Sequence, residues 1–336
     1  MLKQLSEVCG VSGDESRIRS LIKENIQKYA DELIEDDYGN LIVRKGKCKK
    51  HRVLLAAHMD EVGMMITSIE KNGLLKFKAI GLRSQAILAK RVLIGEKNIP
   101  GVIGHKPVHL TNPAERNKNL EIRELFIDIG ISSREEAERL IQIGDLATFD
   151  TKFRKEGDYI YGKAFDNRLG CYILMELIKN YDIPAYYAFT VQEEVGLRGA
   201  RIVAYRIEPD ISIAVDTTGA TEFPEEKDMP NYPVLGRGPV LTIADASIIC
   251  DQKLLNLFEK TAKDNNIPYQ IKQPMIGGTD AGVMHLTRRG VPSMVISTPA
   301  RYIHSPLSIA KLNDVKNSVK LLSLVLGKIT KGVRWN

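Results

Sequence analysis

Apolar runs of strand length alternate with longer segments of helical spacing along much of this chain. Runs without charged residues predict buried strands at 53–57, 185–191, 211–215 and 293–297. Apolar residues at intervals of three and four predict helices at 167–180, 251–265, 280–289 and 311–328. This alternation predicts an α/β protein with a mixed, largely parallel sheet and helices on both faces.

The N-terminal region adds a helix and a hairpin to this pattern. Ser12 and Glu15 have the spacing of a capping box. The helix that follows them carries its apolar face on Ile18, Leu21, Ile22 and Ile26. Residues 38–40, Tyr-Gly-Asn, predict the turn of a hairpin.

Residues 68–156 have a different pattern, which predicts a small inserted domain. Short alternating segments at 74–80, 91–94 and 102–103 are separated by Gly, Pro and Asn. This punctuation is typical of a β-rich unit. The catalytic domain is then discontinuous, made of residues 1–67 and 157–336.

The composition is that of an ordinary enzyme. With 336 residues and 43% hydrophobic content the chain can build a sizeable core, and its length favours two domains. No run reaches the roughly 18 apolar residues of a membrane-spanning helix, and residues 1–7 lack the apolar core of a secretory signal. The cysteines are scattered, without metal-binding or disulfide spacing, at Cys9, Cys48, Cys171 and Cys250. We expect a cytoplasmic protein without a membrane partner.

The charge does not indicate a nucleic-acid partner. The net charge of +6 arises from 48 basic and 42 acidic residues spread over the chain. The basic cluster at 45–52 has no interleaved aromatic residues on which bases could stack, so we interpret it as a solvated loop.

Acidic and imidazole side chains recur where apolar runs give way to turns. They are His58, Asp60, Asp166, Glu193, Glu194, Asp216 and His304. In an open α/β sheet such groups gather outside the carboxyl ends of the strands, so residues far apart in sequence converge there. This pattern is typical of a hydrolase with two metal ions.

Each member of this set also has an ordinary explanation. His58 could be a loop histidine with Asp60 as its hydrogen-bond partner, or a metal ligand whose ring that carboxylate orients. Asp166 precedes an apolar helix, so it could be an N-cap or a carboxylate that bridges two cations.

The adjacent acids Glu193 and Glu194 are more specific. Buried carboxylates must be solvated, paired or bound to metal, and neighbouring side chains point in different directions. One acid could therefore bind metal while the other acts as a general base, and a solvated turn is the alternative. With Asp216 and His304, which are unremarkable alone, the set suits two divalent ions of the zinc, cobalt or manganese kind.

Five motifs give the chain a likeness to a known family over nearly its whole length. They are HMDEVG at 58–63, FDNR at 165–168, VQEEVGLRGA at 191–200, GGTDAG at 277–282 and RYIHSP at 301–306. The chain resembles the family-M42 metalloaminopeptidases, the tetrahedral aminopeptidase group. This group includes glutamyl and deblocking aminopeptidases, and some members are labelled endoglucanases.

The resemblance implies a binuclear site and a fold like that of the binuclear zinc peptidases. By this likeness Asp166 bridges two divalent metal ions. His58 and Asp216 complete one site, and Glu194 and His304 complete the other. Zinc or cobalt is expected, with manganese as a further candidate.

The same likeness implies a mechanism. Two cations about 3.5–4 Å apart lower the pKa of a bridging water and polarise the scissile carbonyl. Glu193 would be the general base and Asp60 the orienter of His58, and a cis peptide bond is implied between Asp166 and Asn167. The expected reaction is hydrolysis of N-terminal residues from peptides with a free N-terminus.

The likeness also implies self-association. The inserted unit would be a β-barrel-like oligomerisation domain, and dimers would assemble into a dodecamer. Neither composition nor spacing indicates this by itself.

Two departures bear on substrate specificity. Asn167 stands where many relatives have Asp, and the segment 217–226 differs from the shorter glycine-rich stretch typical of the family. The motif at 277–282 lacks the G-K-[S/T] ending of a phosphate loop, so we expect Asp280 to cap the next helix. No metal role is expected for His105, His109 or His285.

Other enzyme classes stay open. A related binuclear carboxypeptidase or deacylase would share much of this residue set. A glycoside hydrolase also uses paired carboxylates, about 5–10 Å apart, but does not require the two histidines.

Overall fold

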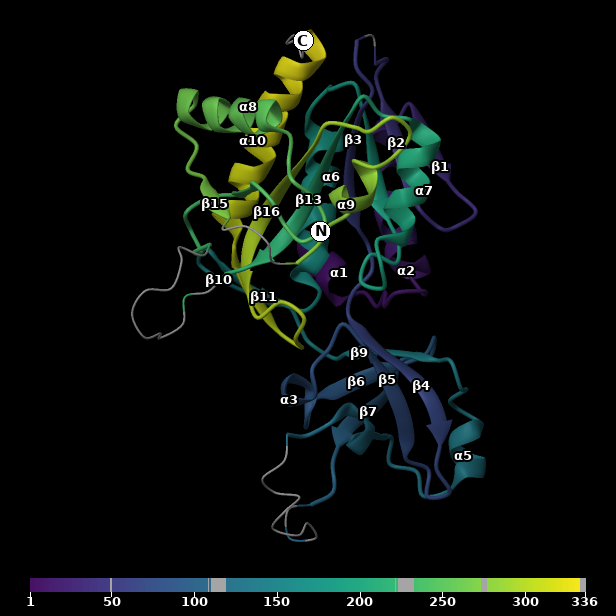
Figure 1. Ribbon diagram of the computed structural model, residues 1–336. Coiled ribbons are helices and arrows are strands. Elements are labelled where there is room, and N and C mark those ends of the chain that lie inside the picture. The colour runs from purple at the N-terminus through teal and green to yellow at the C-terminus, as the bar shows by residue number, and fades with distance from the viewer. Residues whose placement is uncertain are drawn as a thin grey trace.

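Two separate hydrophobic cores divide the chain into a large α/β domain and a small barrel (Figure 1). The computed structural model describes all residues except 49, 108, 110–118, 221, 223–232, 273–276 and 333–336. Part of the predicted loop at 217–226 therefore lies outside the described residues. Among the described residues no helix is long and apolar enough to cross a membrane. All four cysteines are unpaired.

The central strands of the large sheet are parallel. In spatial order they are β12 (Ala185–Thr190), β3 (Val53–His58), β13 (Ile211–Gly219) and β16 (Ser293–Arg301). They are buried along almost their whole length, since apolar runs without alternation suit strands covered on both faces.

Antiparallel strands flank this parallel centre. On one side lie β1 (Glu32–Glu35) and β2 (Leu41–Lys45), and on the other β17 (Ser308–Lys311), β11 (Tyr159–Gly162) and β10 (Arg154–Glu156). Two short strands, β14 (Val240–Thr242) and β15 (Gln270–Lys272), attach beside β16. The predicted mixed sheet is confirmed: its four central strands are parallel, the strands that flank them pair antiparallel, and β14 and β15 form a further parallel pair.

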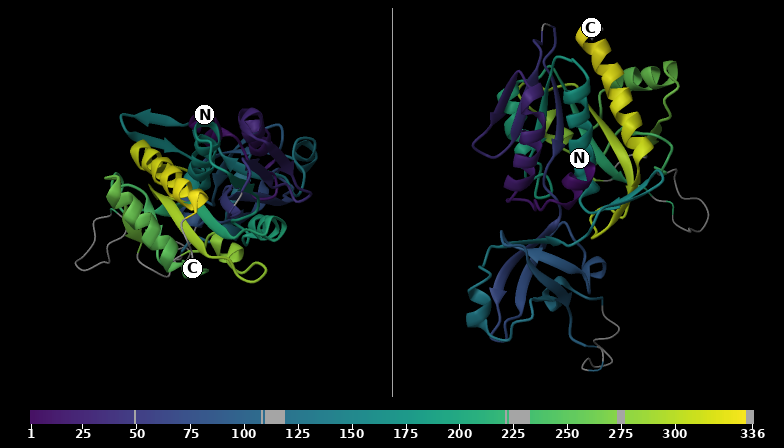
Figure 2. Two further views of the ribbon diagram at one scale, coloured as in Figure 1. Left: turned by 90° about the horizontal axis from the view of Figure 1, so that it is seen from above. Right: turned by 180° about the vertical axis from the view of Figure 1, so that it is seen from behind.

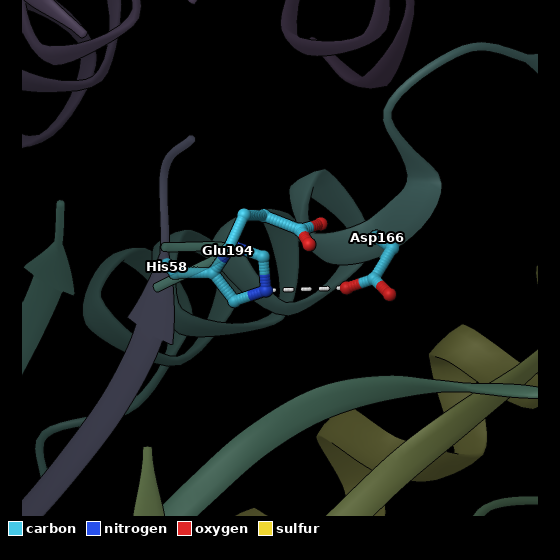
Figure 3. A group of neighbouring side chains, drawn as sticks. All are labelled: His58, Asp166 and Glu194. Carbon is cyan, nitrogen blue, oxygen red and sulfur yellow. Dashed lines mark hydrogen bonds and ion pairs between the residues drawn. The ribbon is translucent and has the colours of Figure 1, made fainter. Parts of the chain in front are cut away.

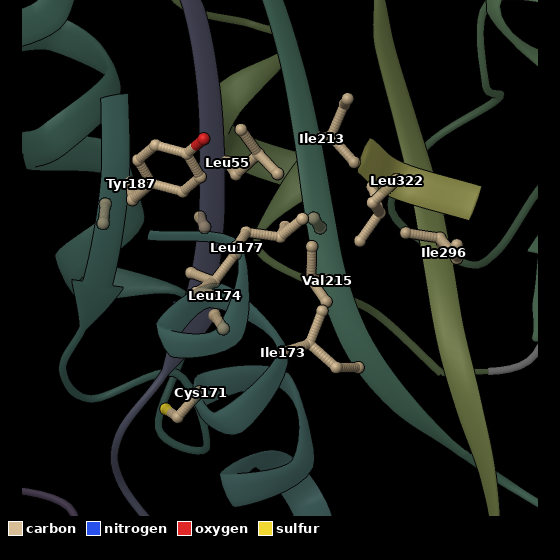
Figure 4. Packing of buried hydrophobic residues seen from close by; sticks show 14 of the residues in the cluster. Leu55, Cys171, Ile173, Leu174, Leu177, Tyr187, Ile213, Val215, Ile296 and Leu322 are labelled. Atoms are coloured by element: carbon tan, nitrogen blue, oxygen red, sulfur yellow. The ribbon is translucent and has the colours of Figure 1, made fainter. Parts of the chain in front are cut away.

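Helices cover both faces of this sheet, as opposite views show (Figures 1 and 2). One face carries α6 (Phe165–Asn180) and α10 (Leu312–Lys331), and the other carries α7 (Arg198–Ile207) and α9 (Ala281–Met284). Apolar side chains of α6 pack on those of the central strands (Figure 4). The remaining helices of this domain are α1 (Leu2–Glu7) and α2 (Ser16–Ile26), which contact α6, and α8 (Gln252–Asp264), which contacts α10.

The second core fills a closed barrel of six antiparallel strands. In chain order these are β4 (Gly63–Ile69), β5 (Leu75–Ile80), β6 (Arg91–Ile94), β7 (Ile99–Gly104), β8 (Phe126–Asp128) and β9 (Leu146–Phe149). Short helices α3 (Ser84–Ile87) and α5 (Arg134–Glu138) join them. The barrel strands thus run from 63 to 149, whereas the sequence pattern placed the insertion at 68–156. The two starting points differ because residues 59–62, between β3 and β4, contain no Gly, Pro or Asn that would indicate a change of domain.

Some local predictions are confirmed and others are wrong. The hairpin is present between β1 and β2. The capping box is absent: α2 begins at Ser16, and the Ser12 hydroxyl donates to Asp60 at 2.6 Å instead. The helix predicted at 280–289 is shorter in the structure: it ends at Met284, and the left-handed φ of +53° at Arg288 excludes a helix as far as residue 289.

A buried ionic network joins the barrel to the large domain. Glu61, 1% exposed, lies between β3 and β4 and accepts hydrogen bonds from Lys163 Nζ at 2.6 and 2.7 Å. It also accepts from the hydroxyl of Thr148, on β9 of the barrel, at 2.9 Å. Arg168, fully buried, donates to the carbonyl oxygens of Leu5 and Met59, each at 2.7 Å.

Loss of the lysine in this network should destabilise the protein. In Lys163→Met the carboxylate of Glu61 keeps its burial but loses its nearest cation, and Arg168, whose Nη2 lies 3.6 Å away, is the cation that remains, so we expect a cost of about 3 kcal/mol. Lys155→Met, on exposed strand β10, is the matched control and should change the free energy of unfolding by less than about 0.5 kcal/mol. Urea unfolding measures both. Equal stability of the two variants would contradict this role for the network.

Candidate metal centre

The strand-end residues gather at the carboxyl edge of the parallel strands. His58 ends β3 and pairs with Thr190, which ends β12. Glu193 and Glu194 follow Thr190 in the next turn, and Asp216 lies towards the end of β13, the other neighbour of β3. Because the strands are parallel, these acids meet at one edge although they are far apart in sequence.

The other two residues enter from outside the parallel strands. Asp166 lies at the start of α6, and the peptide bond to Asn167 is cis, as the family likeness implies. The Asn167 amide donates to the carbonyl of Val215 at 2.9 Å, which ties α6 to β13. His304 lies in the turn between β16 and β17 with φ of +56°. The structure thus brings all the predicted site residues together.

Asp166 faces two histidines with its two carboxylate oxygens. Oδ1 lies 3.1 Å from Nε2 of His58, and Oδ2 lies 3.4 Å from Nε2 of His304. Glu194 Oε2 is also 3.4 Å from that His304 nitrogen. Figure 3 shows His58, Asp166 and Glu194 arranged around a common space.

His58 has two further carboxylates near the same nitrogen. Oε2 of Glu193 and Oδ1 of Asp216 each lie 3.8 Å from its Nε2. Two groups of residues bring their ligand atoms within 4.8 Å of one another: His58, Asp166 and Glu194, and His58, Glu193 and Asp216. Imidazole and carboxylate donors of this kind fit zinc, cobalt or manganese.

Asp60 organises more of this edge than the imidazole alone. Its Oδ1 lies 3.4 Å from His58 Nδ1, which also lies 3.1 Å from the Asp60 backbone oxygen. The backbone N–H groups of Glu193 and Glu194 donate to its carboxylate at 2.9 and 3.1 Å, and Ser12 donates to it as well. One buried carboxylate therefore fixes both the histidine and the turn with the two glutamates.

The site carries more negative charge than its own side chains neutralise. Burial raises the pKa of Glu194 to about 8 and that of Asp216 to about 7, and the nearby Asp166 carboxylate adds to both shifts. Burial likewise raises the pKa of Glu193 well above its usual range. Oε1 of Glu194 is buried without a hydrogen-bond partner among the described residues. Divalent cations would supply the missing positive charge.

The charged forms of Asp166 and the two histidines, by contrast, stabilise one another. Burial disfavours the charge on Asp166, but hydrogen bonds from His304 and His58 hold its pKa below the usual range. The hydrogen bond to Asp166 is the main reason why the pKa of His304 rises to about 9. Asp166 is thus the acid most strongly held in its charged form.

Asp280 is a member of this region that the sequence did not reveal. It precedes α9 but its side chain does not cap the helix, so the expected capping role is wrong. Instead it is 3% exposed and accepts a 2.6 Å hydrogen bond from the hydroxyl of Thr190, while its Oδ1 has no partner among the described residues. Burial raises its pKa to about 6. Its position in the GGTDAG motif was the one signal in the sequence that could have pointed to this role.

The sequence matches the family described as M42 glutamyl aminopeptidase over residues 39–321. A putative aminopeptidase of Acetivibrio thermocellus is 45% identical, with 96% of each chain covered. The lysyl aminopeptidase of Pyrococcus furiosus is 35% identical, over 98% of this chain and 96% of that one. The glutamyl aminopeptidase of Lactococcus lactis is 31% identical, over 97% and 94%.

Solved structures agree with this match. A TET aminopeptidase from a marine sediment Thaumarchaeota archaeon has a TM-score of 0.93 and 38% identity, over 97% of this chain and 94% of that one. An endoglucanase of Thermotoga maritima has a TM-score of 0.82 and 36% identity, over 98% of both. PhTET1-12s, a dodecamer, has a TM-score of 0.85 and 34% identity, over 97% of both. The chain therefore belongs to the M42 family of aminopeptidases and is a peptide hydrolase.

Proposed function

We propose that this protein is a binuclear metal-dependent aminopeptidase that removes N-terminal residues from peptides with a free N-terminus. The observation that carries the proposal is the position of Asp166, whose two oxygens face His58 and His304 separately. A carboxylate so placed suits a bridge between two cations. Asp216 would complete the site on the His58 side, and Glu194 the site on the His304 side. Zinc or cobalt suits these donors best, and manganese is compatible.

Glu193 is the residue placed to move a proton. When bound, the cations lower the pKa of a water molecule and polarise the scissile carbonyl group. The carboxylate of Glu193 lies 3.8 Å from Nε2 of His58, and Asp60 holds its backbone N–H. Its raised pKa makes this carboxylate a stronger proton acceptor, which suits a group that takes a proton from the attacking water and passes it to the departing amine.

Two alternatives have distinct signatures. The likeness to an endoglucanase points to a glycoside hydrolase, but the acids here surround two histidines that such an enzyme does not require. Cellulose hydrolysis that survives complete chelation would favour that class. Cleavage of N-acylated peptides in preference to free-amine peptides would favour a deacylase or carboxypeptidase.

We also propose that the barrel mediates self-association, with dimers building a dodecamer. The dodecameric PhTET1-12s neighbour supports this. On the barrel, Val102, Leu140 and Ile143 expose 45, 40 and 69% of their surface, and a contact between subunits would cover such side chains.

Replacement of Glu193 by Gln should separate proton transfer from metal binding. The variant keeps the size of the side chain but lacks the proton acceptor, so we expect kcat to fall about 10²–10⁴-fold. The amount of bound metal per chain, measured by inductively coupled plasma mass spectrometry, should stay at the wild-type level. The exposed control Glu24→Gln should keep both activity and metal. Near-normal activity of Glu193→Gln would rule this residue out as the base, and loss of metal would place it among the ligands.

Metal affinity should depend on pH, because protons and cations compete for the same carboxylates. With pKa values of about 8 for Glu194 and about 7 for Asp216, both hold protons at lower pH in the metal-free protein. We expect the apparent Zn²⁺ affinity, measured against a chelating indicator, to rise from about pH 6 to about pH 9 and to level off only above that, because Glu194 is half protonated at pH 8 and His304, with a pKa of about 9, must also lose its proton. An affinity that stays flat over this interval would mean that these acids bind no metal.

The native mass tests the proposed assembly. Light scattering after gel filtration, with metal present, should give about twelve times the 37.6 kDa mass of one chain. A monomer mass under these conditions would contradict a role of the barrel in assembly.

A further inference from the structure

A pocket of about 880 Å³ opens beside the candidate metal centre, between the barrel and the turn after β16. His304 is part of its wall, together with Tyr302 and Leu307 of the same turn. Gly81, on the barrel side, lies so close to Glu194 that an added Cβ would be 3.2 Å from its Oε2. The pocket therefore begins at residues of the metal centre itself.

The barrel side of this pocket is positively charged. Arg83, which precedes α3, and Lys90, which precedes β6, both line the pocket and are exposed. Neither forms an ion pair with any residue that the structure describes. Among the described residues that line the pocket there is no carboxylate. In Figure 1 the barrel with α3 lies directly below the large domain that carries the turn after β16.

The size of the pocket indicates which part of a peptide it receives. Its volume is in the range of sites that hold a ligand of several residues or a drug-sized molecule. An enzyme that removes one residue at a time has only that residue on the N-terminal side of the scissile bond. A pocket for several residues therefore fits the departing part of the peptide.

We propose that Arg83 and Lys90 form a cationic subsite that binds a carboxylate on the departing part of the peptide substrate. This inference rests on the proposed aminopeptidase function. The apolar surfaces of Tyr302 and Leu307, 48 and 43% exposed, complement the two cations by contacting the peptide between its charges. The carboxylate could be an acidic side chain beyond the first residue or the C-terminus of a short peptide, since both offer the same acceptor to a guanidinium or ammonium group.

Tetrapeptides with the same N-terminal Ala test the subsite. Ala-Ala-Ala-Ala amide is the neutral reference, Ala-Ala-Glu-Ala amide carries only a side-chain carboxylate, and Ala-Ala-Ala-Ala with a free C-terminus carries only a terminal one. We expect kcat/KM for at least one charged peptide to exceed that for the reference about two- to five-fold or more, with the gain in KM. About 0.5 M NaCl should reduce this ratio, because exposed ion pairs are screened.

Variants assign the preference to the two residues. In the double variant R83Q/K90Q the ratio of charged to neutral kcat/KM should fall to about one. Lys71→Gln is the matched control: this exposed lysine lies at the opposite end of β5 from Gly81, so the ratio should stay at the wild-type value. Whichever charged peptide is preferred identifies the source of the carboxylate.

The outcomes distinguish the subsite from the proposed function. A wild-type enzyme that cleaves all three peptides equally, or a double variant that keeps the wild-type ratio, would overturn the subsite and leave the aminopeptidase function intact. The same three peptides are also made with Lys and with Glu as the first residue, and a wild-type enzyme that releases the first residue from none of them would overturn the proposed function itself.

Discussion

The concentration of carboxylates around one imidazole is the constraint on which the rest of this structure depends. Asp166, Glu193 and Asp216 reach His58 from a helix, a turn and a neighbouring strand. Carboxylates buried this close together oppose one another's ionisation, so each needs a proton, a hydrogen-bond donor or a cation. The backbone must therefore hold in place groups that would repel one another in a flexible chain.

A second layer of charge supplies that rigidity. Lys163 and Arg168 lie on either side of Asp166 in sequence, and both are buried. Arg168 donates to the carbonyl oxygen of Met59, next to Asp60, and Lys163 binds Glu61 on the other side of Asp60. The start of α6 and the end of β3 are thus tied together at the points that carry Asp166 and His58. Glu61 also accepts a hydrogen bond from Thr148 of the barrel, so the same network reaches the second domain.

Much of this edge could be predicted because strand ends are visible in the sequence. His58 and Asp216 belong to apolar runs whose burial the sequence indicates, and parallel strands bring such ends together without further information. Contacts between side chains distant in sequence are a different matter. Ser12 has the spacing of a helix cap, yet its hydroxyl is used by Asp60, 48 residues later in the chain. Asp280 likewise binds Thr190 rather than its own helix, and no local pattern distinguishes the two possibilities.

Together the two domains place negative side chains at the metal centre and positive side chains in the pocket beside it, an arrangement that neither domain has alone. The large domain contributes the carboxylates around His58, and the barrel contributes Arg83 and Lys90 to the adjacent pocket, whose wall includes His304 of the metal centre. A peptide with a free N-terminus has the complementary polarity, with its ammonium group at one end and carboxylates further along. Electrostatic complementarity of this kind selects orientation more than affinity. An enzyme that cuts only at the N-terminus needs this discrimination, and a peptide bound in reverse would place its ammonium group against Arg83 and Lys90. The barrel thereby takes part in orienting the substrate as well as in the proposed assembly, and Glu61, which bonds to both domains, contributes to both roles.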